Sequence, residues 1–250
     1  MPIKLVVSDL DRTLLNDRKE LSPRTIRTLQ AVQQTGIPVV FASARHYLNV
    51  VPFLERLPAD YFLCSNGAGI WQTAPRQLLQ AEAIPPALIL ELLAETEQHH
   101  DLHLRSIGGI SDYLWSELKN DATPTDWQHR LTEPVLTLTL RTNDPAFYRA
   151  HFAADPRLRV FTYFGENIVT LLSAKASKLQ GMNRLLETLA IAPSDIVFFG
   201  DDQNDVALLQ LAGTGVAVAN AVPAALAGAD QVTLSNEQDG VARWLEDHVL

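Results

Sequence analysis

The sequence predicts an α/β protein whose core is a doubly wound parallel sheet, with a smaller α+β domain inserted into it. Three observations support this fold class. Apolar runs near both ends of the chain are continuous rather than alternating, which is typical of strands buried on both faces. Helix-like stretches separate several of these runs. The middle of the chain instead alternates apolar and polar residues, as an antiparallel strand with one wet face does.

The core is expected to begin with a buried strand at residues 3–8 and a helix at 23–34. The further core strands are expected at 37–43, 61–65, 196–200 and 215–219, with a second helix at 205–212. Because these elements come from both ends of the chain, we expect a Rossmann-like core made of residues 1–80 and 175–250.

The inserted domain is expected at residues 81–174, and Pro75 and the pair Pro85-Pro86 mark the junction at its start. Its expected helices are at 86–100 and 145–153, and its expected strands are at 102–107, 112–115, 135–141 and within 158–172. Gly108 and Gly109 supply a turn signal between the first two of these strands. The pattern indicates a small α+β unit with an antiparallel sheet.

Composition excludes several classes of protein. The 250 residues carry a net charge of -9, which argues against broad contact with nucleic acid but not against one small phosphorylated substrate. The single cysteine, Cys64, allows no internal disulfide and is expected to be a buried thiol. No apolar run is long enough to span a membrane, and no secretory signal opens the chain. We expect a cytoplasmic protein, either a monomer or a small homo-oligomer.

Two carboxylates follow the first predicted strand. Asp9 and Asp11 lie two positions apart, so on an extended backbone they share a face while Leu10 points away. Ligands of open parallel sheets bind at the carboxyl ends of the strands, which is where these acids lie. A polar strand end that begins a turn is the alternative, and Asp-x-Asp alone does not decide between the two.

A second acidic group follows the predicted strand at 196–200. Asp201, Asp202 and Asp205 fall within five residues, so their charges repel unless water, a helix terminus or a cation offsets them. Magnesium binds a few carboxylates together with waters and phosphate oxygens, which two acidic strand ends can provide. Helix capping by Asp202 or Asn204 is the alternative, although it does not account for the whole group.

Two weaker features complete the pattern. Ser43, Ala44 and Arg45 follow a predicted strand, where a hydroxyl and backbone amides can hold an anion. Lys178 opens a helix-like run and can supply a point charge to phosphate. Each has a structural alternative, since Ser43 can be a helix N-cap and a lone helix lysine is usually solvated.

Together these features resemble the haloacid dehalogenase superfamily of aspartate-dependent phosphatases. The resemblance covers the core and is strongest in the segments 9–13 and 200–205. The insert, with Ser65-Asn66-Gly67-Ala68, is similar to the Cof-type subfamily, which has a large α+β cap of the C2B type. The sequence departs from the usual motifs at four positions without losing a functional group, namely Arg12, Ala44, Asp202 and Leu179.

The resemblance implies a magnesium-dependent phosphatase acting on a small phosphomonoester, with a sugar phosphate favoured. Asp9 would be the nucleophile that becomes an aspartyl phosphate, and Asp11 the general acid and base, which requires a raised pKa. The metal site would consist of Asp9, Asp11, Asp201 and Asp205. The phosphate would be held by Ser43, Ala44, Arg45, Lys178 and Asn204.

The resemblance also implies that the cap closes over the site and recognises the leaving group. The candidates are Tyr113, Trp115, Glu117, Trp127 and Arg105, although aromatic residues in a small domain usually belong to its core. Two alternatives to a phosphatase remain: a phosphomutase of the same superfamily, and a protein that binds a phosphometabolite without turnover.

One other pattern suggests a metal. His99 and His103 are four residues apart and would share a face of a helix. The segment from 102 to 107 is predicted to be extended, and no further ligand cluster is visible nearby in the sequence. We therefore interpret these histidines as a solvated helix end.

Overall fold

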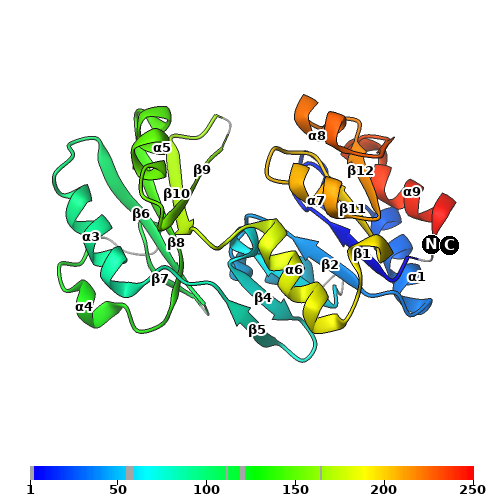
Figure 1. The fold of residues 1–250 in the computed structure, drawn as a ribbon, viewed down its shortest axis with the longest axis horizontal. Coiled ribbons are helices and arrows are strands. Elements are labelled where there is room, and N and C mark those ends of the chain that lie inside the picture. The colour runs from blue at the N-terminus through cyan, green and yellow to red at the C-terminus, as the bar shows by residue number, and fades with distance from the viewer. Residues whose placement is uncertain (1–2, 55–58, 111, 119–121, 164) are drawn as a thin grey trace. The chain divides into compact units, whose positions relative to one another are not determined.

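The computed structural model describes residues 3–54, 59–110, 112–118, 122–163 and 165–250. The chain divides into two compact units (Figure 1). The first unit contains Met1–Leu79 and Ser177–Leu250, and the second contains Gln80–Ala176. The mixed α/β fold predicted from the sequence is confirmed, with a largely parallel sheet in the first unit and an antiparallel sheet in the second.

The first unit is built around an eight-stranded sheet with strand order β13-β12-β11-β1-β2-β3-β4-β5. Its strands are β1 (Leu5–Ser8), β2 (Val39–Ala42), β3 (Tyr61–Cys64), β4 (Gly69–Gln72), β5 (Gln77–Ala81), β11 (Ile196–Gly200), β12 (Thr214–Val218) and β13 (Gln231–Thr233). Neighbouring strands from β13 to β3 run parallel, whereas β4 runs antiparallel to β3. β1, β2 and β11 are buried along their whole length, as their continuous apolar sequences predict.

Helices cover both faces of this sheet (Figure 1). α1 and α9 pack together on one side, while α6 and α7 pack together on the other. The helices and 3-10 turns of the unit are α1 (Pro23–Gln34), η1 (Tyr47–Asn49), α2 (Val51–Leu54), η2 (Ser65–Gly67), α6 (Lys178–Leu189), η3 (Pro193–Asp195), α7 (Val206–Leu211), α8 (Pro223–Gly228), η4 (Asn236–Gln238) and α9 (Gly240–His248). α1 begins where the sequence predicts, because Ser22 caps it and Pro23 occupies its first turn.

The second unit contains a five-stranded antiparallel sheet with strand order β7-β6-β8-β10-β9. Its elements are α3 (Pro86–Thr96), β6 (Leu102–Gly109), β7 (Tyr113–Ser116), α4 (Trp127–Arg130), β8 (Val135–Thr142), α5 (Pro145–Ala153), β9 (Leu158–Thr162) and β10 (Ile168–Ser173). Apolar side chains of α3, α5 and the sheet form one core. α3 is shorter than predicted and ends before the histidines at 99 and 100.

Two of the side chains considered for recognition belong to this core. Trp115 and Trp127 are buried and meet edge to face, with ring centroids 6.3 Å apart. Glu117 instead forms ion pairs with Arg105 and Arg141. The alternative of packing is therefore confirmed for both tryptophans.

Two further expectations concern the single cysteine and membrane-spanning helices. Cys64 is fully buried on β3, and burial raises the pKa of its thiol to about 12, so it is an unreactive core residue. Among the described residues, no helix has both the length and the apolar content needed to cross a membrane.

Glu246 joins α9 to α1 and gives a test of this packing. Its carboxylate accepts hydrogen bonds from Arg24 and, at 2.7 Å, from Thr28 Oγ1, and these bonds lower its pKa to about 2. A depressed pKa in the folded state means that the carboxylate stabilises the fold above about pH 4.3 and loses this effect as the pH falls toward 2. We expect Glu246→Gln to lower the melting temperature at pH 7 by about 2–4 °C, and by less at pH 3.

Glu187→Gln is the matched control, because Glu187 is exposed on α6. It should leave the melting temperature unchanged at both pH values. An equal loss at pH 7 and pH 3 in Glu246→Gln would show that the ionised carboxylate does not hold the two helices together.

Candidate active site

The carboxyl ends of β1 and β11 bring two acidic segments together. Ser8 pairs with Phe199 in the parallel ladder, and the backbone N–H of Asp9 donates to the Phe199 carbonyl at 2.9 Å. Asp9 and Asp201 therefore leave the sheet from adjacent strands at the same edge. This is the arrangement that the two sequence motifs predict.

A buried lysine lies between two of these acids. Lys178 Nζ donates to Asp9 Oδ1 at 2.6 Å and to Asp205 Oδ1 at 2.7 Å. The side chains of the lysine and of both acids are nearly inaccessible to water. Charged groups this deeply buried require partners, so the interpretation of Lys178 as a solvated helix residue is wrong.

α6 carries Lys178 to this position. Ser177 caps the helix by accepting a hydrogen bond from the Gln180 N–H at 3.1 Å. The helix start lies against the loop after β3, where Gly67 has a φ of +81° and a side-chain carbon would stand 2.4 Å from the Ser177 carbonyl oxygen. Only glycine allows both that backbone conformation and this close approach.

Asp205 is held in place by its own loop. Its Oδ2 accepts hydrogen bonds from the N–H groups of Asp201 at 3.2 Å and Asp202 at 3.1 Å, while its Oδ1 faces Lys178. It is also the N-cap of α7, although its side chain does not cap the helix. The alternative of helix capping by Asp202 or Asn204 is therefore wrong.

Burial, together with repulsion between neighbouring acids, disfavours the ionised forms of Asp9 and Asp201. Burial raises the pKa of Asp9 well above its usual value, and Lys178 offsets this only in part because Asp205 and Asp201 add to the rise. Burial also raises the pKa of Asp201 to about 6. The hydrogen bond that Thr13 Oγ1 donates to it at 2.8 Å lowers the pKa but does not outweigh burial. A cation among these acids would relieve their repulsion.

Asp11 lies in a different charge environment. Arg45 binds its carboxylate through Nε and Nη2, both at 2.7 Å, and Lys19 Nζ donates to it at 2.7 Å. Burial raises its pKa, but the bonds from Arg45 and Lys19 outweigh burial and lower the pKa to about 2. The raised pKa expected of a general acid is therefore not found in this arrangement.

The backbone explains the difference between the two motif acids. β1 ends at Ser8, and a turn follows in which Arg12 has a φ of 62°. The extended backbone that would place Asp9 and Asp11 on one face does not continue past the strand. The two carboxylates therefore have different cations as partners.

The segment after β2 forms a bend rather than a helix start. Ser43 is buried, and its Oγ accepts a hydrogen bond from the Arg45 N–H at 3.2 Å. Ala44 lies between them and is half-buried. The next helical turn, η1, is capped by His46, so the N-cap alternative for Ser43 is wrong.

Asn204 reaches the neighbouring loop. Its Nδ2 donates to Asn66 Oδ1 at 3.0 Å, while its Oδ1 is buried with no hydrogen-bond partner among the described residues. Ser65 Oγ, in the same loop, is also buried without one. Buried polar atoms that lack partners often mark a place where water, an ion or a ligand binds.

Three contacts of this site were not predicted. Thr13 hydrogen-bonds to Asp201, Lys19 pairs with Asp11, and Arg12 and Asn220 exchange hydrogen bonds through their backbone carbonyls. Thr13 could have been anticipated, because it stands at a fixed distance from Asp9 in the motif. Lys19 carries no comparable signal.

The acidic cluster fits a metal ion. One carboxylate oxygen each of Asp9, Asp201 and Asp205 lies within 4.8 Å of the others. Both oxygens of Asp205 already accept hydrogen bonds from the chain, which leaves Asp9 and Asp201 as the more available ligands. Hard cations such as Mg²⁺ prefer oxygen ligands of this kind.

Fold and site together define an α/β enzyme with an acidic centre at the carboxyl edge of its sheet. The sequence model of the haloacid dehalogenase-like hydrolases matches residues 6–245. The chain therefore belongs to this family and is a phosphatase of the haloacid dehalogenase type, as the motifs predict.

Known proteins with similar sequences align with all or nearly all of this chain. Pyridoxal phosphate phosphatase YbhA of Escherichia coli K12 is 24% identical and aligns over 100% of both chains. The 5-amino-6-(5-phospho-D-ribitylamino)uracil phosphatase YitU of Bacillus subtilis 168 is 24% identical, over 98% of this chain and 97% of its own. A haloacid dehalogenase-like hydrolase from Bacteroides thetaiotaomicron has a similar structure, with a TM-score of 0.84, 25% identity and coverage of 98% and 99%.

Removal of the buried lysine should destabilise the protein. Lys178→Met leaves Asp9 and Asp205 buried without their shared cation, and breaking a buried ion pair costs about 3–5 kcal/mol. We expect a clearly lower melting temperature in chelator and partial recovery when Mg²⁺ is added. Lys175→Met, at an exposed neighbouring lysine, should change neither the melting temperature in chelator nor the melting temperature with Mg²⁺. Equal stability of Lys178→Met and the wild type in chelator would contradict the charge balance described above.

Proposed function

We propose that the protein hydrolyses a small phosphomonoester in a Mg²⁺-dependent reaction that passes through an aspartyl phosphate, an acyl phosphate formed on Asp9. Sugar phosphates are the first candidate substrates. The observation that carries this proposal is the buried group of Asp9, Asp201, Asp205 and Lys178 at the ends of β1 and β11.

Asp9 is the nucleophile. Its carboxylate attacks phosphorus, the bond between phosphorus and the substrate oxygen breaks, and the alcohol leaves. Water then attacks the phosphorus of the aspartyl phosphate and regenerates Asp9. Lys178 supports the nucleophile because its hydrogen bond at 2.6 Å fixes the orientation of Oδ1, leaving the other oxygen of Asp9 for the reaction.

Asp11 transfers the proton in both steps. It protonates the departing alkoxide and later accepts a proton from the attacking water. In the ion pair with Arg45 and Lys19, the pKa of Asp11 is low and its carboxyl group is ionised at neutral pH. Asp11 can therefore act as an acid only after these two cations have moved away from it. Arg45 is well placed for this exchange, since a guanidinium freed from a carboxylate can bind a phosphate with the same paired geometry.

Asp9, the backbone carbonyl of Asp11, and Asp201 would hold Mg²⁺, with Asp205 supporting them. When bound, Mg²⁺ offsets the repulsion between an anionic carboxylate and a phosphate dianion. Thr13 holds the Asp201 carboxylate by its hydrogen bond at 2.8 Å, and the loop amides hold Asp205.

The phosphate oxygens would be bound by Ser43, the Ala44 backbone, Arg45, Lys178 and Asn204. Hydrogen-bond donors fixed around a transferring phosphoryl group stabilise the charge on its equatorial oxygens. Residues 81–174, nearly all of the second unit, would act as a cap that selects the leaving group. Glu117 is the first residue to test there, because Trp115 belongs to the core.

A substrate panel tests the proposal. Sugar phosphates, pyridoxal phosphate and nucleotides are incubated with the protein and Mg²⁺, and inorganic phosphate is measured. We expect release from at least one sugar phosphate, and no release in excess chelator. Binding without release, or phosphate returned to the product only when a bisphosphate is added, would overturn the proposal in favour of a binding protein or a phosphomutase.

A further inference from the structure

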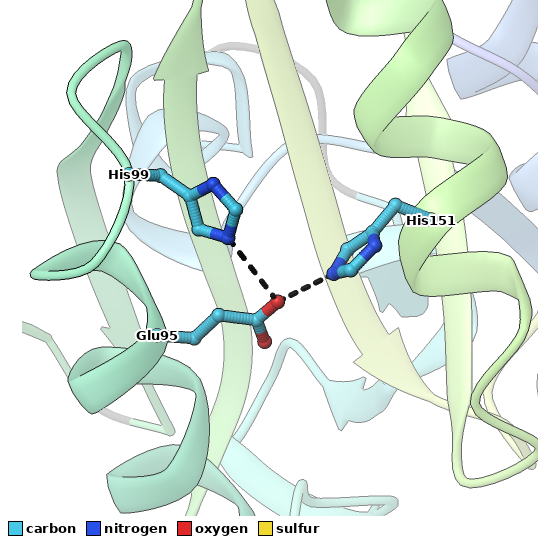
Figure 2. A group of neighbouring side chains, drawn as sticks. All are labelled: Glu95, His99 and His151. Atoms are coloured by element: carbon cyan, nitrogen blue, oxygen red, sulfur yellow. Dashed lines mark hydrogen bonds and ion pairs between the residues drawn. The ribbon is translucent and has the colours of Figure 1, made fainter.

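The second unit contains a separate group of metal-binding side chains. Glu95 lies in the last turn of α3, His99 follows that helix, and His151 lies on α5. One potential ligand atom from each lies within 4.8 Å of the others. Figure 2 shows both imidazole rings directed at the Glu95 carboxylate, with the ring of His151 approaching from α5.

Both rings present the same nitrogen to the same oxygen. Nε2 of His151 is 2.5 Å from Glu95 Oε1, and Nε2 of His99 is 3.9 Å from it. Zinc binds nitrogen and oxygen ligands at about 2.0–2.2 Å, so two ligand atoms of a tetrahedral ion stand about 3.3 Å apart. One of the two distances is shorter than this value and the other is longer. A shift of less than about 1 Å in Glu95 Oε1 would therefore bring both distances to the separation expected around zinc.

Neighbouring aromatic side chains orient the two rings. His99 meets the ring of Tyr148 edge to face at 5.6 Å, and the buried Tyr148 donates a hydrogen bond to Asp101 at 2.7 Å. His151 stacks with Phe147 at 6.1 Å and an interplanar angle of 13°. Rings held in this way lose little rotational freedom when they bind an ion.

A hydrogen bond between α3 and α5 is the alternative explanation for the cluster. That explanation requires only the hydrogen bond between His151 and Glu95. The i, i+4 spacing places His99 near Glu95, but at 3.9 Å its Nε2 forms no hydrogen bond with Oε1, so this explanation does not account for the direction of the second ring. The spacing of His99 and His103 in the sequence is misleading in this respect, because His103 lies on β6 and the partners of His99 come from α3 and α5.

The ligand types indicate which metal binds. Two imidazole nitrogens and one carboxylate are a ligand set of zinc, whereas magnesium prefers oxygen alone. The three side chains are 28% to 40% exposed, which leaves room for water at a fourth position. We infer that Glu95, His99 and His151 form a Zn²⁺ site in the second unit, distinct from the acidic cluster of the first.

Equilibrium dialysis of the full chain against Zn²⁺ tests this site, with excess Mg²⁺ present to occupy the acidic cluster. The wild type should bind one zinc ion that the double variant His99→Gln/His151→Gln does not bind. Glutamine can still donate a hydrogen bond to Glu95 but lacks the imidazole nitrogen. We expect Zn²⁺ binding to weaken by more than about 100-fold, since changes to residues that merely support ligands already cost about 10- to 100-fold.

His103→Gln is the matched control and should retain the zinc, because His103 is exposed on β6 and outside the cluster. Zn²⁺ should also raise the melting temperature of the wild type and of this control, but not of the double variant. His99→Gln alone keeps the hydrogen bond between His151 and Glu95, so it remains informative if the double variant does not fold. Equal Zn²⁺ binding by wild type and either cluster variant, or none by the wild type, would overturn the inference.

Discussion

Asp9→Asn is expected to abolish turnover while leaving the protein folded. The amide is nearly isosteric with the carboxylate but lacks the anion that attacks phosphorus. Loss of a nucleophile should reduce kcat by on the order of 10⁴-fold or more. The measurement is steady-state phosphate release with the best substrate of the panel.

The same variant should not be less stable than the wild type in chelator. Burial raises the pKa of Asp9, and the neighbouring Asp205 and Asp201 add to the rise, so the charged form is unfavourable there without a metal. Lys178 keeps its second partner, Asp205, at 2.7 Å. An unchanged or higher melting temperature is therefore expected, together with weaker stabilisation by Mg²⁺.

Asp202→Asn is the matched control, since Asp202 is an exposed acid in the same loop as Asp201. It should retain most of the activity. Substantial turnover by Asp9→Asn, or an equal loss in both variants, would contradict a nucleophilic role for Asp9.

Asp11→Asn should slow reactions selectively, according to the leaving group. A sugar alkoxide needs a proton as it departs, whereas a nitrophenolate leaves without one. General acid catalysis contributes about 10²- to 10⁴-fold, so this loss should appear with a sugar phosphate and be small with nitrophenyl phosphate. The ratio of kcat/KM for the two substrates is the quantity to measure.

The contacts of Asp11 supply the competing explanation. Its carboxylate holds Arg45 and Lys19, so it could serve only to position these cations. In that case, Asp11→Asn would reduce both reactions by the same factor. The nitrophenyl ester is thus the internal control, because it depends on the phosphate-binding groups but not on proton donation.

The sequence predicted the acidic centre because each of its parts follows from a local rule. Asp9 and Asp201 come directly after buried strands that are neighbours in a parallel sheet. Lys178 opens a helix that Ser177 caps. A strand end and a helix start can be recognised without knowledge of the tertiary structure.

The contacts of Asp11 could not be predicted in the same way. They depend on the turn after β1, where Arg12 adopts a positive φ, and on the bend that carries Arg45. The strands β4 and β5, which extend the sheet beyond β3, were also missed, because strand pairing at the edge of a sheet depends on tertiary contacts.

The cluster of Glu95, His99 and His151 illustrates a different limit. Its two segments are separated by more than fifty residues and meet only when α3 and α5 pack on the second sheet. In the sequence, His99 was considered together with His103 because of their spacing, but α3 ends at Thr96 and His103 lies on β6. Local spacing in the sequence could therefore not identify His151 as a partner of His99.

The central claim is that phosphate passes through a covalent bond to Asp9. Rapid mixing with a substrate labelled in its phosphoryl group, followed by an acid quench within one turnover, measures this directly. We predict that label appears on the protein in the presence of Mg²⁺, is released by hydroxylamine as expected of an acyl phosphate, and maps to the peptide containing Asp9. Phosphate release at the normal rate with no label on the protein, or label on another residue, would contradict the account.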